Sequence, residues 1–190
     1  MKVIGLVGEK RGGKGTFAEL LREALPDAQI ECLRFSDIIG DILKILDIPC
    51  TRENMQKLPV GLMEIFSDNS VITKAMERRI RGQVAHIVIL DGIRTHSDVQ
   101  TLKKFPESML IYVTASQEIR YQRALKATEK VGENKISFDQ FKKQDEAEIE
   151  KMIPSIGSTA DHIVFNEGSL TEYQNEVLAI CRLFNLNPTE

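Results

Sequence analysis

The sequence predicts a three-layer α/β fold, in which helices cover both faces of a five-stranded parallel sheet. Apolar segments of strand length alternate along the chain with segments of helical periodicity, an order that builds a parallel sheet through right-handed crossovers. The segment 84–90 is almost continuously apolar, as expected for a central strand covered on both faces. At 190 residues, 42% of them hydrophobic and 28% charged, the chain is long enough to form one domain.

The first predicted strand, 3–7, leads into the glycine-rich segment GEKRGGKGT, residues 8–16. The glycines Gly8, Gly12, Gly13 and Gly15 let the backbone curl until successive N–H groups point into one concavity. A helix that begins near Lys14 adds the positive end of its dipole. The spacing is that of a phosphate-binding loop, in which Lys14 reaches the β- and γ-phosphates of a nucleoside triphosphate.

Periodicity and proline positions predict the elements between this loop and residue 81. They are a helix over 16–25, a strand over 30–35, a helix from Ser36 to before Pro49, a short broken segment over 51–59 and a longer helix over 60–81. We expect the longer helix to turn inward the apolar side chains Leu62, Ile65, Phe66, Ile72 and Met76.

In the second half of the chain, serines followed three residues later by Gln or Glu predict helix starts. These capping boxes are Ser97 with Gln100, Ser137 with Gln140 and Ser169 with Glu172. The remaining elements are strands over 84–90, 109–113 and 162–165, and helices from 97 to before Pro106, over 116–128, over 137–153 and from 169 onwards. The segment 130–135 is a polar, glycine-containing break.

Two helical stretches lie outside the alternation of strands and helices. We therefore expect a core of 1–36, 82–123 and 154–190, with an acceptor-binding insertion over about 37–81 and a lid over about 124–153. Both insertions lie at the carboxyl end of the predicted sheet, where ligands bind in open α/β folds.

Several residues near the same sheet edge are candidates for chemistry. Asp91 ends the apolar strand and is expected to hold Mg²⁺, with the Thr16 hydroxyl as a second contact, either directly or through water. Arg94 has the planar fork that suits a phosphate. Asp37 is either a group that orients or deprotonates the acceptor, or a carboxylate that favours the dipole of its own helix. Arg120 and Arg123 share one helix face and are expected to close over the triphosphate.

With these residues in view, the chain resembles the P-loop nucleoside monophosphate kinase superfamily over nearly its whole length. The GKGT ending of the loop and the segment LDGIRT, residues 90–95, are similar to adenylate kinase. Archaeal nucleotide-kinase-like proteins are more similar in that segment, in Arg120–Arg123 and in Asn166–Ser169. Phage deoxynucleoside monophosphate kinases share the Lys10-Arg11 pair, and dephospho-coenzyme A kinases share parts of the pattern.

The resemblance implies a P-loop kinase fold, ATP on the loop beside Arg11, and Arg123 near the adenine or the phosphates. It also implies that Asn166 and Gly168 lie against the adenine, and that Asp37 and Arg94 face a small phosphorylated acceptor. Gly40, Lys126 and Gln144 stand where relatives carry arginines. These departures leave open a dephospho-coenzyme A kinase, with Asp37 as base, and an ATP-binding switch with little kinase activity.

Composition limits the remaining possibilities. A net charge of −3 argues against an extended nucleic-acid surface, and three widely spaced cysteines form neither a metal site nor a disulfide framework. The N-terminus lacks the plan of a signal peptide, and no apolar run is long enough to cross a bilayer. We therefore expect a cytoplasmic protein, a monomer or a homodimer, without a membrane partner.

Overall fold

A computed structural model of the chain describes residues 1–126, 136–146 and 148–186. Its strands are β1 (Lys2–Val7), β2 (Ile30–Arg34), β3 (Ile87–Ile93), β4 (Ser108–Thr114) and β5 (His162–Phe165). The described helices are α1 (Lys14–Ala24), α2 (Phe35–Ile45), α3 (Arg52–Phe66), α4 (Val71–Arg81), α5 (His96–Lys103), α6 (Gln117–Lys126), α7 (Phe138–Asp145), α8 (Glu148–Gly157) and α9 (Leu170–Leu183).

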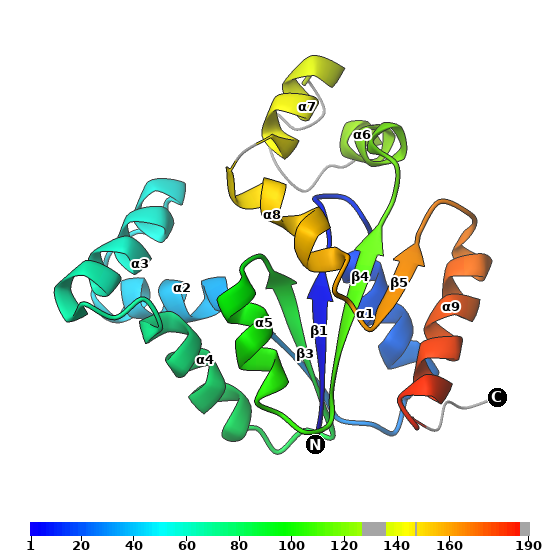
Figure 1. Cartoon of the computed structure of the whole chain (residues 1–190), viewed down its shortest axis with the longest axis horizontal. Helices are drawn as coiled ribbons and strands as arrows, with labels where there is room; N and C mark the ends of the chain where they lie inside the picture. Colours follow the sequence, from blue (N-terminus) through cyan, green and yellow to red (C-terminus); the bar gives the residue numbers. More distant parts are fainter. Residues whose placement is uncertain (127–135, 147, 187–190) are drawn as a thin grey trace.

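The strands form one parallel sheet in the order β2-β3-β1-β4-β5, which confirms the predicted α/β fold. Helices α1 and α9 pack on one face of the sheet, and α4, α5 and α8 pack on the other (Figure 1). Strand β1 is central and pairs with β3 on one side and β4 on the other, so its carboxyl end opens between two neighbours. Helices α6 and α7 lie beyond the carboxyl ends of the strands, and α8 runs from there onto the face of the sheet.

The prediction of a broken segment followed by one helix over 60–81 is wrong. Thr51 caps α3, which contains Pro59, and a turn separates α3 from α4. In that turn Ser67 is left-handed with φ 48°, and the Ser70 N–H donates to Asp68 Oδ1 over 2.8 Å. Because this turn interrupts the helix, residues 60–66 and 71–81 do not share one continuous inward face. Ile72 and Met76 are buried, whereas Ile65 and Phe66 are 75% and 64% exposed.

Strand β3 begins and ends three residues later than predicted. Val84 is exposed, and Asp91-Gly92 lies inside the strand rather than after it. Gly92 has φ +83° and the pairing with β1 shifts register at this point, so the strand continues through a bulge. Asp91 nevertheless remains at the carboxyl end of the sheet.

The helix caps in the second half of the chain agree with the predicted capping boxes in two of three places. Helix α5 is capped by Thr95 and Asp98, not by Ser97 and Gln100. The boxes predicted at Ser137 and Ser169 are confirmed. The predicted helix over 137–153 is two helices, α7 and α8. The break predicted over 130–135 and the end of the helix predicted over 116–128 lie outside the described residues.

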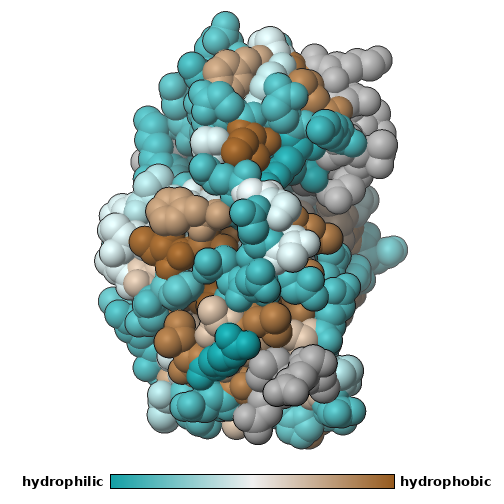
Figure 2. Space-filling model, turned by 90° about the vertical axis from the view of Figure 1, so that its right-hand side faces the viewer, coloured by the Kyte–Doolittle hydropathy of each residue, from teal (hydrophilic) through white to brown (hydrophobic). Residues whose placement is uncertain are grey.

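The face of the molecule shown in Figure 2 is mostly hydrophilic, with hydrophobic patches across its middle. Strand β5 is an edge strand, and its Ile163 and Phe165 are 39% and 70% exposed. Across the described ranges, no helix combines the length and the apolarity needed to span a bilayer.

Helix α8 depends on core packing, because Ile153 and Ile156 are buried with residues of β1, β3 and β4. We predict that Ile156→Ala lowers the free energy of unfolding by about 2–5 kcal/mol through lost burial and a residual cavity. The matched change Ile65→Ala on the exposed side of α3 should cost less than about 0.5 kcal/mol. Urea unfolding of both variants measures this, and equal losses would contradict the assignment of Ile65 to the surface.

Candidate functional site

The glycine-rich loop joins β1 to α1 and lies directly against β4. A Cβ atom at Gly8 would be 2.1 Å from the Val113 carbonyl oxygen, and one at Gly12 would be 2.8 Å from the same atom. A side chain at either position would therefore collide with strand backbone. These two glycines allow the loop to approach β4 closely. This is a second reason for glycine at these positions, besides the tight curl of the loop backbone that the sequence predicts.

Two side chains from the far end of the chain hold the other side of the loop. The amide of Asn166 donates to the Gly12 carbonyl over 3.0 Å, and the Tyr173 hydroxyl donates to the Gly13 carbonyl over 3.0 Å. Gly13 has φ +115°, and a Cβ there would lie 2.2 Å from Asn166 Nδ2. Glycine is therefore required at position 13 for two reasons, the positive φ angle and the lack of space for a Cβ atom beside Asn166.

Glu9 anchors the loop to β4 and was not singled out from the sequence. Its carboxylate accepts hydrogen bonds from the Tyr112 hydroxyl and, over 2.8 Å, from the Thr114 hydroxyl. Burial and the bond to Glu9 raise the pKa of Tyr112 to about 12, so the phenol remains a donor at neutral pH. No local sequence signal marks an acidic residue in a phosphate loop as an anchor.

Lys14 is the first residue of α1 and its ammonium lies over the loop. It donates to the carbonyl oxygens of Gly8 over 2.6 Å and Glu9 over 3.1 Å. Burial lowers the pKa of Lys14, and the negative charge of Asp91 opposes that shift. A charge held by neutral carbonyls at a helix N-terminus is placed to receive an anion.

The loop borders a cavity of about 760 Å³. The predicted site residues that line it are Arg11, Gly13, Lys14, Gly15, Thr16, Asp91, Arg94, Arg123, Asn166 and Gly168. Residues that the sequence analysis missed also line it, namely Lys10, Glu19, Arg34, Glu150, Leu170 and Tyr173. Gly8, Gly12, Asp37 and Arg120 are not among the lining residues.

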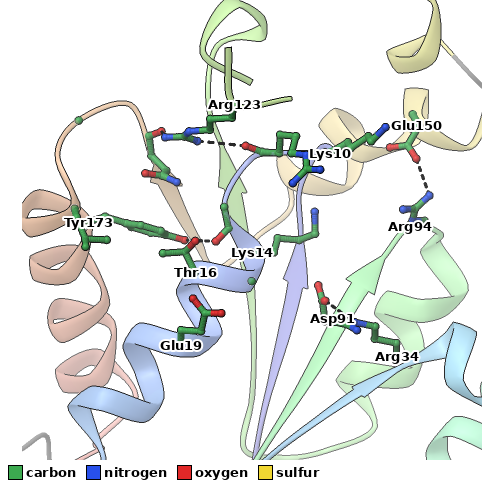
Figure 3. Close-up of a pocket in the computed structure, with 16 residues that line it drawn as sticks. Lys10, Lys14, Thr16, Glu19, Arg34, Asp91, Arg94, Arg123, Glu150 and Tyr173 are labelled. Atoms are coloured by element: carbon green, nitrogen blue, oxygen red, sulfur yellow. Dashed lines mark hydrogen bonds and ion pairs between the residues drawn. The ribbon is translucent and has the colours of Figure 1, made fainter. Parts of the chain in front are cut away.

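Asp91 shares its carboxylate with Arg34, whose Nε donates to Asp91 Oδ2 over 2.9 Å (Figure 3). That hydrogen bond raises the pKa of Arg34. Asp91 Oδ1 is buried and has no hydrogen-bond partner within the described ranges. Arg34 could have been found by the rule that selected Asp91, because it is the last residue of a strand at the same sheet edge.

The unpaired oxygen of Asp91 suits a hard cation. Mg²⁺ takes oxygen ligands and is often held by one or two carboxylates together with waters and substrate phosphates. Among the described residues, no group of three or more His, Cys, Asp or Glu side chains is arranged to hold a metal. The residues present therefore fit a cation that is carried in with a phosphate ligand.

The carboxylate of Asp37 is engaged in a capping interaction at the start of α2. Its Oδ2 accepts the Arg34 backbone N–H over 2.8 Å and forms a capping box. Of the two interpretations of Asp37 that the sequence left open, the structure shows the helix-favouring contact. Ser36, predicted to cap this helix, lies inside its first turn.

The two arginines of α6 have different surroundings. Arg123 lines the cavity and donates to the Asn166 carbonyl over 2.8 Å and to the Arg11 carbonyl over 3.3 Å. Burial lowers its pKa. Arg120 is 5% exposed, and its guanidinium makes a bidentate pair with Asp145 at 3.1 and 2.6 Å. Arg120 therefore links α6 to α7 behind the loop instead of facing the cavity.

Helices α7 and α8 contribute contacts at the cavity rim. Lys10 Nζ donates to Gln144 Oε1 over 3.1 Å, and Arg94 donates to Glu150 Oε1 over 2.6 Å. Figure 3 shows Arg94 and Glu150 on the opposite side of Lys14 from Arg123 and Tyr173. The cavity thus has two ends, with Lys14 between them.

Comparison with known proteins shows relatives along the whole chain, although no family model matches it. A UPF0200 protein of Methanoculleus marisnigri is 30% identical over 185 residues, which cover 96% of this chain and 97% of that protein. A UPF0200 protein of Sulfurisphaera tokodaii is 25% identical over 176 residues, covering 93% of both chains.

Solved structures share the fold at low sequence identity. Shikimate kinase from Bacteroides thetaiotaomicron superposes with a TM-score of 0.62 at 14% identity, covering 97% of this chain and 99% of that chain. A gluconokinase from Sinorhizobium meliloti gives a TM-score of 0.58 at 17% identity, covering 97% and 94%. The chain therefore has the P-loop kinase fold that its loop indicated.

The loop geometry yields a matched pair of substitutions. We predict that Gly13→Ala lowers the free energy of unfolding by at least about 1–3 kcal/mol, because φ +115° and Asn166 both oppose a Cβ. Gly15→Ala, where no atom lies within 4 Å of the new Cβ, should be neutral or stabilising by about 0.5–1 kcal/mol, since Ala favours a helix. Urea denaturation distinguishes them; equal stabilities would contradict the geometry of Gly13.

Proposed function

The chain belongs to the UPF0200 family, and we propose that it is an ATP- and Mg²⁺-dependent kinase that phosphorylates a nucleoside or deoxynucleoside monophosphate. The observation that carries the proposal is the position of Lys14. Its ammonium lies at a helix N-terminus over a glycine loop, beside a cavity with cations at both ends. This arrangement suits a polyphosphate donor and an anionic acceptor that meet near Lys14.

The donor end is formed by the loop, Arg123 and the segment after β5. Arg123 is fixed by carbonyls of Asn166 and Arg11, so its guanidinium is positioned before any phosphate arrives. Tyr173 and the exposed Leu170 give the same end apolar surface for a nucleobase. These contacts support ATP as the donor.

Asp91 and Thr16 are the proposed contacts for Mg²⁺. Both line the cavity, and Asp91 Oδ1 lacks a partner among the described residues. The ion, when bound with ATP, offsets charge on the β- and γ-phosphates. Arg34 holds the other carboxylate oxygen and so fixes the orientation of Asp91.

The acceptor end is formed by Arg94, Arg34 and Glu150, on the far side of Lys14 from Arg123. A guanidinium binds an acceptor phosphate in a bidentate manner. Lys14 then neutralises charge that develops on the transferred group, and Arg123 adds to this from the donor side. The protein supplies position and charge for an in-line transfer, and no covalent intermediate is needed.

We predict that Lys14→Ala reduces turnover by about 10³-fold or more, because it removes the charge between donor and acceptor. Transfer from labelled ATP to a panel of nucleoside monophosphates, deoxynucleotides and dephospho-coenzyme A measures this. Lys103→Ala, an exposed lysine of α5, should retain wild-type turnover. Wild-type activity in Lys14→Ala would contradict the role of Lys14, and tight ATP binding without transfer to any acceptor would favour a nucleotide-binding switch.

A hydroxyl acceptor is the second candidate, as in dephospho-coenzyme A kinase. It is favoured by the fold neighbours, which are a shikimate kinase and a gluconokinase. A hydroxyl acceptor needs a base, whereas a phosphate is already ionised. Asp37 was the predicted base, yet its carboxylate caps α2 and does not line the cavity.

We predict that Asp37→Asn has less than a tenfold effect on turnover, and that its main effect is a loss of about 0.5–2 kcal/mol in stability from the weakened cap. The transfer assay and urea unfolding together check this. A loss of transfer of about 10²-fold or more, after correction for the fraction of protein that is folded, would instead identify Asp37 as a general base and the acceptor as a hydroxyl.

A further inference from the structure

Glu150 places a negative charge at the acceptor end of a cavity that otherwise suits anions. Its Oε1 accepts a hydrogen bond from Arg94 over 2.6 Å, and its side chain is 17% exposed, against 46% for Arg94. Both side chains line the cavity (Figure 3). The carboxylate is therefore the more enclosed partner, and it covers one donor of the arginine that we assign to the acceptor.

The backbone that carries Glu150 is held in place. Ile153, three residues further along α8, and Ile156 are 1% and 0% exposed in the core. A Cβ at Gly157 would lie 2.5 Å from the Tyr112 ring, so α8 packs on β4 through its backbone. Tyr112 in turn donates to Glu9 of the phosphate loop. Movement of α8 away from the cavity would therefore expose Ile153 and Ile156 and lose core packing.

An anion that approaches Arg94 meets this carboxylate. The ion pair carries no net charge, so it attracts a free phosphate much less than Arg94 alone would. A phosphate must turn Glu150 away from Arg94 or share the guanidinium with it, and like charges at short range disfavour both. An acceptor that also binds through its base and sugar has additional favourable contacts that offset this cost.

From this geometry we infer that Glu150 is a specificity-determining residue of the acceptor site. By pairing with Arg94, it weakens the binding of free phosphate and other small anions, so that Arg94 is available chiefly to an acceptor with further contacts. The inference rests on the proposed function, because it assigns the Arg94 end of the cavity to the acceptor.

The test uses inorganic phosphate as the probe and protein saturated with ADP and Mg²⁺, so that the loop is occupied. Phosphate binding is followed by the ¹⁵N resonance of Arg94 Nε, which is assigned by its loss in Arg94→Ala. We expect Glu150→Gln to bind phosphate at least about tenfold more tightly than wild type, since it keeps the shape but removes the charge. Glu146→Gln, an exposed glutamate just after α7, should change the affinity less than twofold.

A second variant and a double mutant keep the result unambiguous. Glu150→Ala should also tighten phosphate binding, and Glu150→Gln in an Arg94→Ala background should not, when binding is followed by phosphate calorimetry. Unchanged or weaker phosphate binding in Glu150→Gln and Glu150→Ala would overturn the role of Glu150. Failure of ADP to bind the wild-type protein is a separate result, which would overturn the proposed function.

Discussion

The contact between the glycine loop and strand β4 is the constraint on which the site depends. The Val113 carbonyl lies where Cβ atoms of Gly8 and Gly12 would be, and Glu9 accepts hydrogen bonds from Tyr112 and Thr114 of the same strand. Strand β1, which leads into the loop, pairs with β4. The loop is therefore held against the strand next to the one from which it emerges. This close approach leaves the loop amides and the first turn of α1 at the edge of the cavity, where phosphate would bind.

Lys14, Arg34 and Arg94, which line the cavity, are paired with other groups of the protein. Lys14 is held by carbonyls of the loop, and the ion pairs Arg34–Asp91 and Arg94–Glu150 occupy the proposed acceptor end. Leaving such groups unpaired in a partly buried site would be costly, so the fold satisfies most of them internally. Under the proposed function, ligand binding exchanges these internal partners for ligand groups, and selectivity is set by how strongly each internal partner competes. Asp91 Oδ1 is buried without a hydrogen-bond partner in the part of the chain that the structure describes, and it marks a point that suits a cation.

Much of the fold and the geometry of the glycine loop could be predicted from the sequence, because they depend on local patterns. The spacing in the loop and the apolar strand before Asp91 are short-range signals, and the parallel sheet follows from alternation. Other features depend on contacts between distant segments, and no local pattern encodes them. Arg120 looked like a phosphate ligand by its spacing, but Asp145, on another helix, pairs with it. Glu150 lay in a charged stretch, and only the packing of α8 brings it to Arg94.

The most direct test of the central claim is a calorimetric titration of the wild-type chain with ATP in the presence of Mg²⁺. The claim is that loop amides held against β4, together with one ammonium, bind a polyphosphate. It predicts saturable binding of one nucleotide per chain that pyrophosphate competes away. An absence of heat and of competition with both ATP and GTP would contradict it.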